Sequence, residues 1–264
     1  MESVGRKGAA PPPLRIYLTG KLSIEKGSTL VGPEAFPAVQ GSLAFARLAV
    51  DHGHVVGRDE LAEVLWPRKL PRAHEAALSA IMSKLRTLLG RVGLKEKDAL
   101  SGTLGGYQLS LPPGTWIDLE AAGRALHDAE TACRARRWKA VFGPAHVGYQ
   151  IGRRPFFLGE ECPWLDEKRE RLRSIFVRSA ECLGEFYIAQ DDPKLAVEAA
   201  REVVQREPFR ESGHRLLMRA LAAAGNRADA LWAYEKCRKL ISEELGVDPS
   251  AETRSIYQKL LRSR

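Results

Sequence analysis

The side chains best suited to chemistry lie on one predicted helix, residues 73–89. Its apolar residues recur at helical spacing, so the opposite face is polar and cationic. Lysine and arginine neutralise phosphate groups, and small or hydroxyl side chains can contact base edges when a helix enters the DNA major groove. The alternative is that Lys84 and Arg86 are only the solvated face of an amphipathic helix. The residues on the polar face are Ser79, Ser83, Lys84, Arg86 and Thr87.

Two neighbouring segments favour DNA contact over that alternative. A short basic turn, residues 67–72, precedes the helix, and its two prolines make it rigid. A hairpin that contains Gly105, Gly106 and Tyr107 follows the helix. We therefore add Arg72 and Tyr107 to the predicted DNA-binding residues.

The elements around this helix are predicted to form a small α+β module. Alternating apolar residues indicate half-buried strands, and a 3.6-residue period indicates helices. Three helices followed by a hairpin are the order of a winged helix. The predicted elements are strands at residues 14–18 and 29–31, helices over residues 43–49, 58–66 and 73–89, and a hairpin over residues 103–111.

Four short motifs make the prediction more specific. They are Arg58-Asp59-Glu60-Leu61, Leu65-Trp66-Pro67, Met82-Ser83-Lys84-Leu85-Arg86 and Gly106-Tyr107-Gln108-Leu109. They resemble the response-regulator-type winged helix, and more closely its version in the Streptomyces antibiotic regulatory protein (SARP) family. In that family an N-terminal sheet packs against three helices, and the third helix enters the major groove. The resemblance implies that the polar face of residues 73–89 meets DNA and that residues 105–107 lie at or near the wing.

The same resemblance implies a transcription activator. Such regulators bind side by side to direct repeats near a promoter, which allows a homodimer on double-stranded DNA. They also contact RNA polymerase, commonly through the turn that here contains Arg68, Lys69 and Leu70. The resemblance therefore implies a cytoplasmic, nucleoid-associated protein with DNA and RNA polymerase as partners.

The second half of the chain is predicted to be all-helical and repetitive. Residues align at a period of 34, which is the length of the tetratricopeptide repeat. We interpret the repeated residues as core, because paired helices approach closely at these points. The aligned pairs are Ala196 with Ala230, Val197 with Leu231, Ala200 with Tyr234 and Val203 with Cys237.

A second set of motifs follows in the order expected for the SARP family. They resemble the bacterial transcriptional activator domain that follows the winged helix there. The sequence thus predicts a disordered tail over residues 1–13, a winged helix over residues 14–115 and a helical domain over residues 116–264. The motifs are Pro163-Trp164-Leu165, Glu170-Arg171-Leu172, Pro208-Phe209-Arg210-Glu211, Leu217-Met218, Ala230-Leu231, Tyr234 and Glu243-Glu244-Leu245-Gly246-Val247-Asp248-Pro249-Ser250.

Two basic clusters in the second half leave another function open. Clustered arginines bind phosphate well, so a small anionic effector or a second contact with the DNA backbone is one interpretation, and solvated helix ends are the other. The clustered arginines are Arg134, Arg136, Arg137, Arg153 and Arg154.

A third hypothesis is a protein-interaction adaptor with weakened DNA binding, because residues 38–42 lack cations.

The bulk composition agrees with a nucleic-acid partner. The net charge is +8, and residues 1–117 carry 15 Lys and Arg against 10 Asp and Glu. The four cysteines stand far apart, without metal-ligand spacing, and are expected to be buried free thiols. We find no membrane span and none of the nucleotide-binding, zinc-hydrolase or nucleophile motifs. We therefore expect that the protein is not an enzyme and that it binds no metal or cofactor.

Overall fold

The computed structural model describes residues 13–262, so residues 1–12 of the predicted tail lie outside the described part of the chain. The chain forms two compact units. The first contains the residues up to Glu120 together with Arg154–Arg169, and the second contains Ala121–Arg153 and the residues from Glu170 onward. The predicted domain boundary between residues 115 and 116 lies near the first division. The return of residues 154–169 to the first unit was not expected from the sequence.

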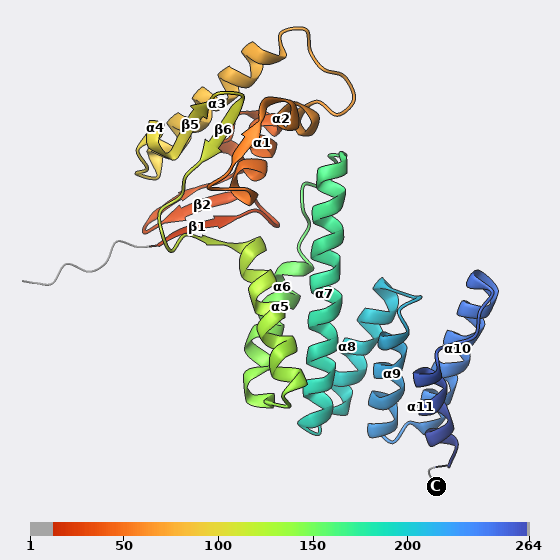
Figure 1. Ribbon diagram of the computed structural model, residues 1–264. Coiled ribbons are helices and arrows are strands. Elements are labelled where there is room, and N and C mark those ends of the chain that lie inside the picture. The colour runs from red at the N-terminus through yellow and green to blue at the C-terminus, as the bar shows by residue number, and fades with distance from the viewer. Residues whose placement is uncertain (1–12, 263–264) are drawn as a thin grey trace, which may run out of the picture. The chain divides into compact units, whose positions relative to one another are not determined.

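The first unit begins with a four-stranded sheet in the order β3-β2-β1-β7, of which β1 and β2 are labelled in Figure 1. Ile16 on β1 stands opposite Ile24 on β2, and both side chains are fully buried. Alternation along the strands therefore buries one face of the sheet. The strands predicted at residues 14–18 and 29–31 are confirmed. The bounds are β1 Leu14–Tyr17, β2 Ser23–Lys26, β3 Thr29–Val31 and β7 Trp116–Ile117.

Strand β7 corrects the expectation that no strand follows residue 115. Trp116 and Ile117 pair in parallel with Arg15 and Ile16 of β1. A two-residue strand shows no periodicity, and its partner lies at the start of the unit. For these reasons sequence patterning could not detect it.

Three helices and a second sheet complete the winged-helix part of the first unit. A 3-10 turn, η1, precedes the helices, and the short helix α4 precedes the hairpin. The second sheet has the strand order β4-β6-β5, and its hairpin begins three residues earlier than predicted. The bounds are η1 Pro33–Ala35, α1 Ala38–Val50, β4 Val55–Gly57, α2 Arg58–Leu65, α3 His74–Arg91, α4 Glu96–Ala99, β5 Leu100–Thr103 and β6 Gly106–Leu109.

The returning segment, residues 154–169, has a main-chain hydrogen bond to the N-terminal part of the first unit and side-chain bonds within itself. The Gly20 amide donates to the Pro155 carbonyl oxygen at 2.8 Å. The guanidinium of Arg169 donates to the carbonyl oxygens of Phe156, Phe157 and Glu160 at 3.0, 2.5 and 2.6 Å. One cation therefore satisfies three main-chain acceptors and fixes the loop ahead of α7.

The second unit contains helices and no strand among its described residues (Figure 1). Two helices, α5 and α7, begin in the first unit and continue into the second. The predicted fold class, a small α+β module followed by helical repeats, is confirmed. The bounds are α5 Asp118–Arg134, η2 Trp138–Ala140, α6 Phe142–Gly152, α7 Pro163–Ala189, α8 Pro193–Arg206, α9 Glu211–Ala223, α10 Arg227–Leu245 and α11 Ala251–Arg262.

The 34-residue period corresponds to equivalent positions in α8 and α10. Ala196 and Ala230 are each the fourth residue of their helix, and both are fully buried. A Cβ atom on Gly184 would lie 2.6 Å from the side chain of Leu216, so α7 and α9 approach closely there. The interpretation of the repeated small residues as core is confirmed.

Within residues 13–262 we find no helix with the length and apolar character needed to cross a membrane. The same part of the chain contains no cluster of three or more His, Cys, Asp or Glu side chains that could hold a metal ion.

Candidate DNA-binding surface

Helix α3 separates an apolar face from a polar one. Its buried side chains are Leu78, Met82, Leu85, Leu88 and Leu89, whereas Ile81 is only half-buried. This burial gives α3 one fixed rotation about its axis. Four of the five predicted groove-facing residues are exposed on the other side, namely Ser79, Ser83, Lys84 and Thr87.

Arg86 differs from its neighbours because it is half-buried. Its Nε donates to the carbonyl oxygen of Leu100 at 2.8 Å. A Cβ atom on Gly102 would lie 3.8 Å from the Arg86 Nη2, so the guanidinium lies along β5. Arg86 therefore connects α3 to the hairpin, and only part of its donor capacity is left for a partner.

Tyr107, which we predicted to be a DNA-binding residue, is buried. It is 4% exposed in the middle of the second sheet, and the guanidinium of Arg58 lies 5.0 Å from its ring centroid. The turn of the hairpin is formed by Leu104, which is fully exposed, and Gly105, with φ of +93°. Because β6 is the central strand, Tyr107 packs inside the wing and positions it.

Arg58 is the residue that sequence reasoning missed at this surface. It lies at the start of α2, and its Nη1 donates to the Glu75 carboxylate at 2.7 Å, while its guanidinium covers Tyr107. One side chain thus joins α2, the first turn of α3 and the hairpin. Its only signal in the sequence was its place in the first winged-helix motif.

The basic turn between α2 and α3 is exposed. Arg68, Lys69, Leu70 and Arg72 all lie at the surface, and Leu70 keeps half of its side chain exposed. Arg68 lies 3.4 Å from the Glu161 carboxylate, but both groups are largely solvated, so this ion pair contributes little. The turn therefore presents cations around one apolar side chain.

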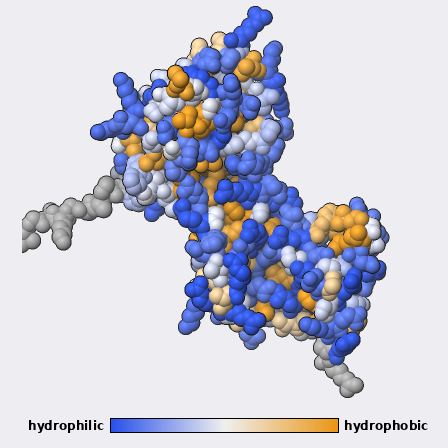
Figure 2. Space-filling view, viewed as in Figure 1, coloured by the Kyte–Doolittle hydropathy of each residue, from blue (hydrophilic) through white to orange (hydrophobic). Residues whose placement is uncertain are grey.

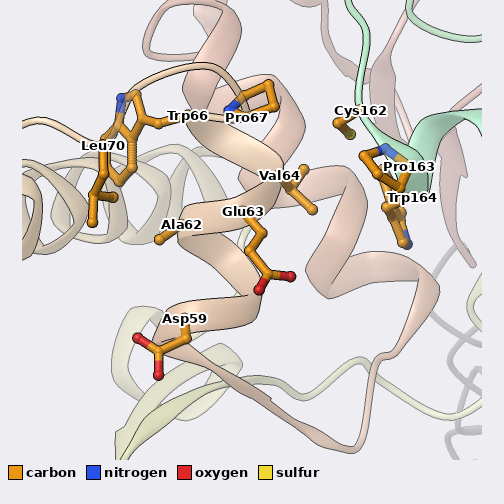
Figure 3. Close-up of a pocket in the computed structure, with 10 residues that line it drawn as sticks. All are labelled: Asp59, Ala62, Glu63, Val64, Trp66, Pro67, Leu70, Cys162, Pro163 and Trp164. Carbon is orange, nitrogen blue, oxygen red and sulfur yellow. The ribbon is translucent and has the colours of Figure 1, made fainter.

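A cavity of about 470 Å³ lies beside this turn (Figure 3). Leu70 and Trp66 lie together on one side of it, and Pro163 and Trp164 from the returning segment lie on the other. Its apolar lining and its size are typical of sites for a ligand or for a large partner side chain. Its other lining residues are Asp59, Ala62, Glu63, Val64, Pro67 and Cys162.

The five arginines predicted to bind an anion are divided between the two units. Arg134, Arg136 and Arg137 are exposed at the end of α5, and Arg134 donates to the Thr131 hydroxyl at 3.1 Å. Arg153 covers the Tyr149 ring, at 5.3 Å from its centroid. Arg154 belongs to the first unit and the other four to the second.

Comparison with known proteins identifies the family. Residues 117–261 match the family model described as the bacterial transcriptional activator domain. This chain belongs to that family. The predicted resemblance to SARP-type regulators is confirmed, because its relatives include regulators of that type.

Three relatives cover almost all of this chain. It is 27% identical over 256 residues to the regulatory protein AfsR of Streptomyces griseus, covering 95% of this chain and 25% of AfsR. It is 25% identical to the transcriptional regulatory protein EmbR of Mycobacterium tuberculosis, covering 94% of this chain and 63% of EmbR. It is 28% identical to the regulatory protein DnrI of Streptomyces peucetius, covering 95% of this chain and 93% of DnrI. The chain thus spans a quarter of the length of AfsR and less than two thirds of EmbR.

A solved structure has the same fold. It is Mycobacterium tuberculosis EmbR in complex with a low affinity phosphopeptide, with a TM-score of 0.84 and 24% identity, covering 94% of this chain and 65% of EmbR. At this identity the likeness supports the arrangement of elements.

Proposed function

We propose that this chain is a DNA-binding transcription activator whose α3 lies in the major groove. The observation that carries the proposal is the exposed polar face of α3, whose apolar face is fixed in the core. Ser79, Ser83 and Thr87 contribute small and hydroxyl groups at base edges, and Lys84 neutralises a phosphate. Arg86 holds α3 against the hairpin. The relatives of this chain are named as transcriptional regulators, which supports the same proposal.

A mobility-shift titration against promoter fragments from the neighbourhood of the gene tests the groove contact. Lys84→Ala removes one exposed cation and should weaken binding about equally at different sequences, with the salt slope reduced by roughly one. Lys21→Ala is the matched control, because Lys21 is exposed on the sheet side of the first unit. Equal affinity and equal salt slope for Lys84→Ala and the unmodified chain would refute the assignment.

The proposal extends to RNA polymerase through the turn at residues 67–72. Arg68, Lys69 and Arg72 present positive charge to an acidic surface, and Leu70 supplies an apolar anchor next to the cavity of Figure 3. Hot spots of this kind combine one buried apolar group with a charged rim. The proposal also includes two copies of the chain bound side by side to direct repeats. It places the protein in the cytoplasm, in association with the nucleoid.

A second candidate function, a protein-interaction adaptor, is favoured by one surface of the helical unit. Figure 2 shows an apolar patch on this unit where the α8–α9 and α10–α11 loops lie, and Phe209, Leu245 and Val247 are 48%, 55% and 55% exposed. The Glu211 carboxylate accepts from the Ser250 amide, which holds these two loops together. Exposed apolar groups in proximity are typical of protein contacts.

Substitution distinguishes the two candidates. Phe209→Ser with Val247→Ser should leave DNA affinity unchanged if the chain acts through α3. Retained promoter activation by this double variant would favour the activator without a partner at the patch. Weak DNA binding by the unmodified chain, together with lost activation by the double variant, would favour the adaptor.

A further inference from the structure

Two cysteines that are 49 positions apart meet between α5 and α7. The Cys133 thiol lies in the last turn of α5 and donates to the carbonyl oxygen of Cys182 at 3.9 Å. Cys133 also packs against the apolar cluster that contains Cys182. The other two cysteines are elsewhere, with Cys162 in the first unit and Cys237 on α10.

The two thiols differ in accessibility. Cys133 is partly exposed, whereas Cys182 is 6% exposed within an apolar cluster of α5, α6 and α7. A small oxidant from solvent therefore reaches Cys133 first. A sulfur oxidised at Cys133 stays within reach of Cys182, because the cluster holds both side chains on facing helices.

The surroundings also make the two thiols chemically unequal. The adjacent Cys182 side chain lowers the pKa of Cys133, and Arg134 adds to this, while burial and the carboxylates of Glu185 and Glu130 oppose it. The net pKa of Cys133 is below its ordinary value. The adjacent Cys133 side chain and burial raise the pKa of Cys182. Since the thiolate is the reactive species, Cys133 is the better nucleophile toward an oxidant.

We propose that Cys133 and Cys182 form a redox site that closes to a disulfide when the protein meets a hydroperoxide. The Cys133 thiolate attacks one peroxide oxygen and the O–O bond breaks, which leaves a sulfenic acid and releases hydroxide, or an alkoxide from an organic peroxide. The Cys182 sulfur then attacks the Cys133 sulfur, the S–O bond breaks, and water leaves. With hydrogen peroxide, two thiols and one peroxide give one disulfide and two waters.

The bond would have a definite structural effect. It closes a covalent ring of residues 133–182, which contains α6 and the whole segment that returns to the first unit. It also joins α5 and α7, the two helices along which the chain passes between units. The exposed cation Arg134, the residue after Cys133, adds positive charge near the reactive thiolate.

The test uses the full chain and needs no variant at first. Reduced protein is treated with graded hydrogen peroxide, remaining thiols are alkylated, and peptides are mapped by mass spectrometry without reduction. We expect a peptide pair joined through Cys133 and Cys182, reversed by dithiothreitol, at peroxide levels that leave Cys162 and Cys237 alkylated. Cys133 and Cys182 that remain free, or that oxidise no earlier than Cys237, would overturn the proposal.

Variants separate the two roles. Cys182→Ser should stop the reaction at the sulfenic acid of Cys133, which dimedone traps, and Cys133→Ser should abolish both products. Cys237→Ser is the matched control. Cys237 is buried on another helix, α10, and burial raises its pKa to about 11. This variant should oxidise as the unmodified chain does. Circular dichroism checks that each variant folds. A disulfide between two chains through Cys133 would also refute the intramolecular site.

Discussion

The buried carboxylate of Asp118 accepts two hydrogen bonds from Thr19, one from the backbone amide at 2.9 Å and one from the hydroxyl group at 2.7 Å. It also accepts from the amides of Leu18, at 3.0 Å, and Leu119, at 2.8 Å. One side chain therefore holds the end of β1 and the first turn of α5. Asp118 is 0% exposed, so each of these bonds is shielded from water.

Replacing Asp118 by asparagine should destabilise the first unit by about 2–3 kcal/mol, because the amide group offers one acceptor where the carboxylate has two and leaves buried donors without a partner. Urea unfolding followed by tryptophan fluorescence measures the change. Asp128→Asn is the control, since Asp128 is exposed on the same helix. An unfolding free energy equal to that of the unmodified chain would mean that the four bonds are dispensable.

The hairpin should not tolerate a side chain at Gly106. A Cβ atom there would lie 2.3 Å from the Val56 carbonyl oxygen, so Gly106→Ala must push β4 away from β6. We expect a loss of about 2–4 kcal/mol in unfolding free energy and weaker DNA binding. Gly102→Ala in β5 meets other atoms only at 3.8 Å or more and should be close to neutral. Similar losses for the two variants would contradict the close approach.

Acid should weaken the helical unit through His214. Burial lowers the pKa of His214, against opposing effects of the Pro208 carbonyl and Glu211. The folded state therefore disfavours the charged ring, whereas the unfolded chain takes up a proton near the ordinary value of 6.5. This part of the stability is fully present above pH 6.5 and is lost as the pH falls toward the lower, folded-state value.

Urea unfolding at pH 7.5 and 5.5 measures this dependence. His214→Gln retains a donor for the Pro208 carbonyl, which His214 Nε2 contacts at 2.7 Å, and should flatten the loss between the two pH values. His127→Gln, at an exposed position on α5, should keep the full loss. An equally steep loss in His214→Gln would assign the effect to other groups.

The turn between α2 and α3 should separate activation from DNA binding. Leu70→Ser removes the exposed apolar group beside the cavity and should lower promoter activation about tenfold while DNA affinity stays unchanged, as expected when a hot-spot side chain is lost. Run-off transcription and mobility shift on the same fragment measure the two quantities. Leu30→Ser, at an exposed position on β3, is the control. Unchanged activation by Leu70→Ser would exclude this side chain as an anchor.

Local periodicity predicted much of this fold. The face of α3 that carries Leu78, Met82 and Leu85 could be assigned because each side chain repeats with the helical turn. The repeat in the second unit was visible because Ala196 and Ala230 occupy equivalent buried positions. Strand β7 and the return of residues 154–169 were missed, since both depend on pairing with distant segments.

The sequence predicted which face of α3 is exposed, but it did not predict which residues of the candidate site contact one another. The exposure of Ser79, Ser83, Lys84 and Thr87 follows from the burial of their neighbours. The bond from Arg86 to the Leu100 carbonyl and the burial of Tyr107 depend on how the hairpin packs against α3, which no local pattern records. The same holds for Cys133 and Cys182, whose neighbourhood is created only when α5 meets α7.

The returning segment has a practical consequence for engineering relatives of this protein. A fragment cut after Glu120 would lose Phe156, Cys162 and Leu165, which are all buried in the intact chain, and with them one side of the cavity next to the basic turn. The winged helix is therefore not an independent N-terminal fragment. Chimaeras that exchange operator preference between family members should carry residues 154–169 together with the winged helix, or the transplanted module will lack part of its own core.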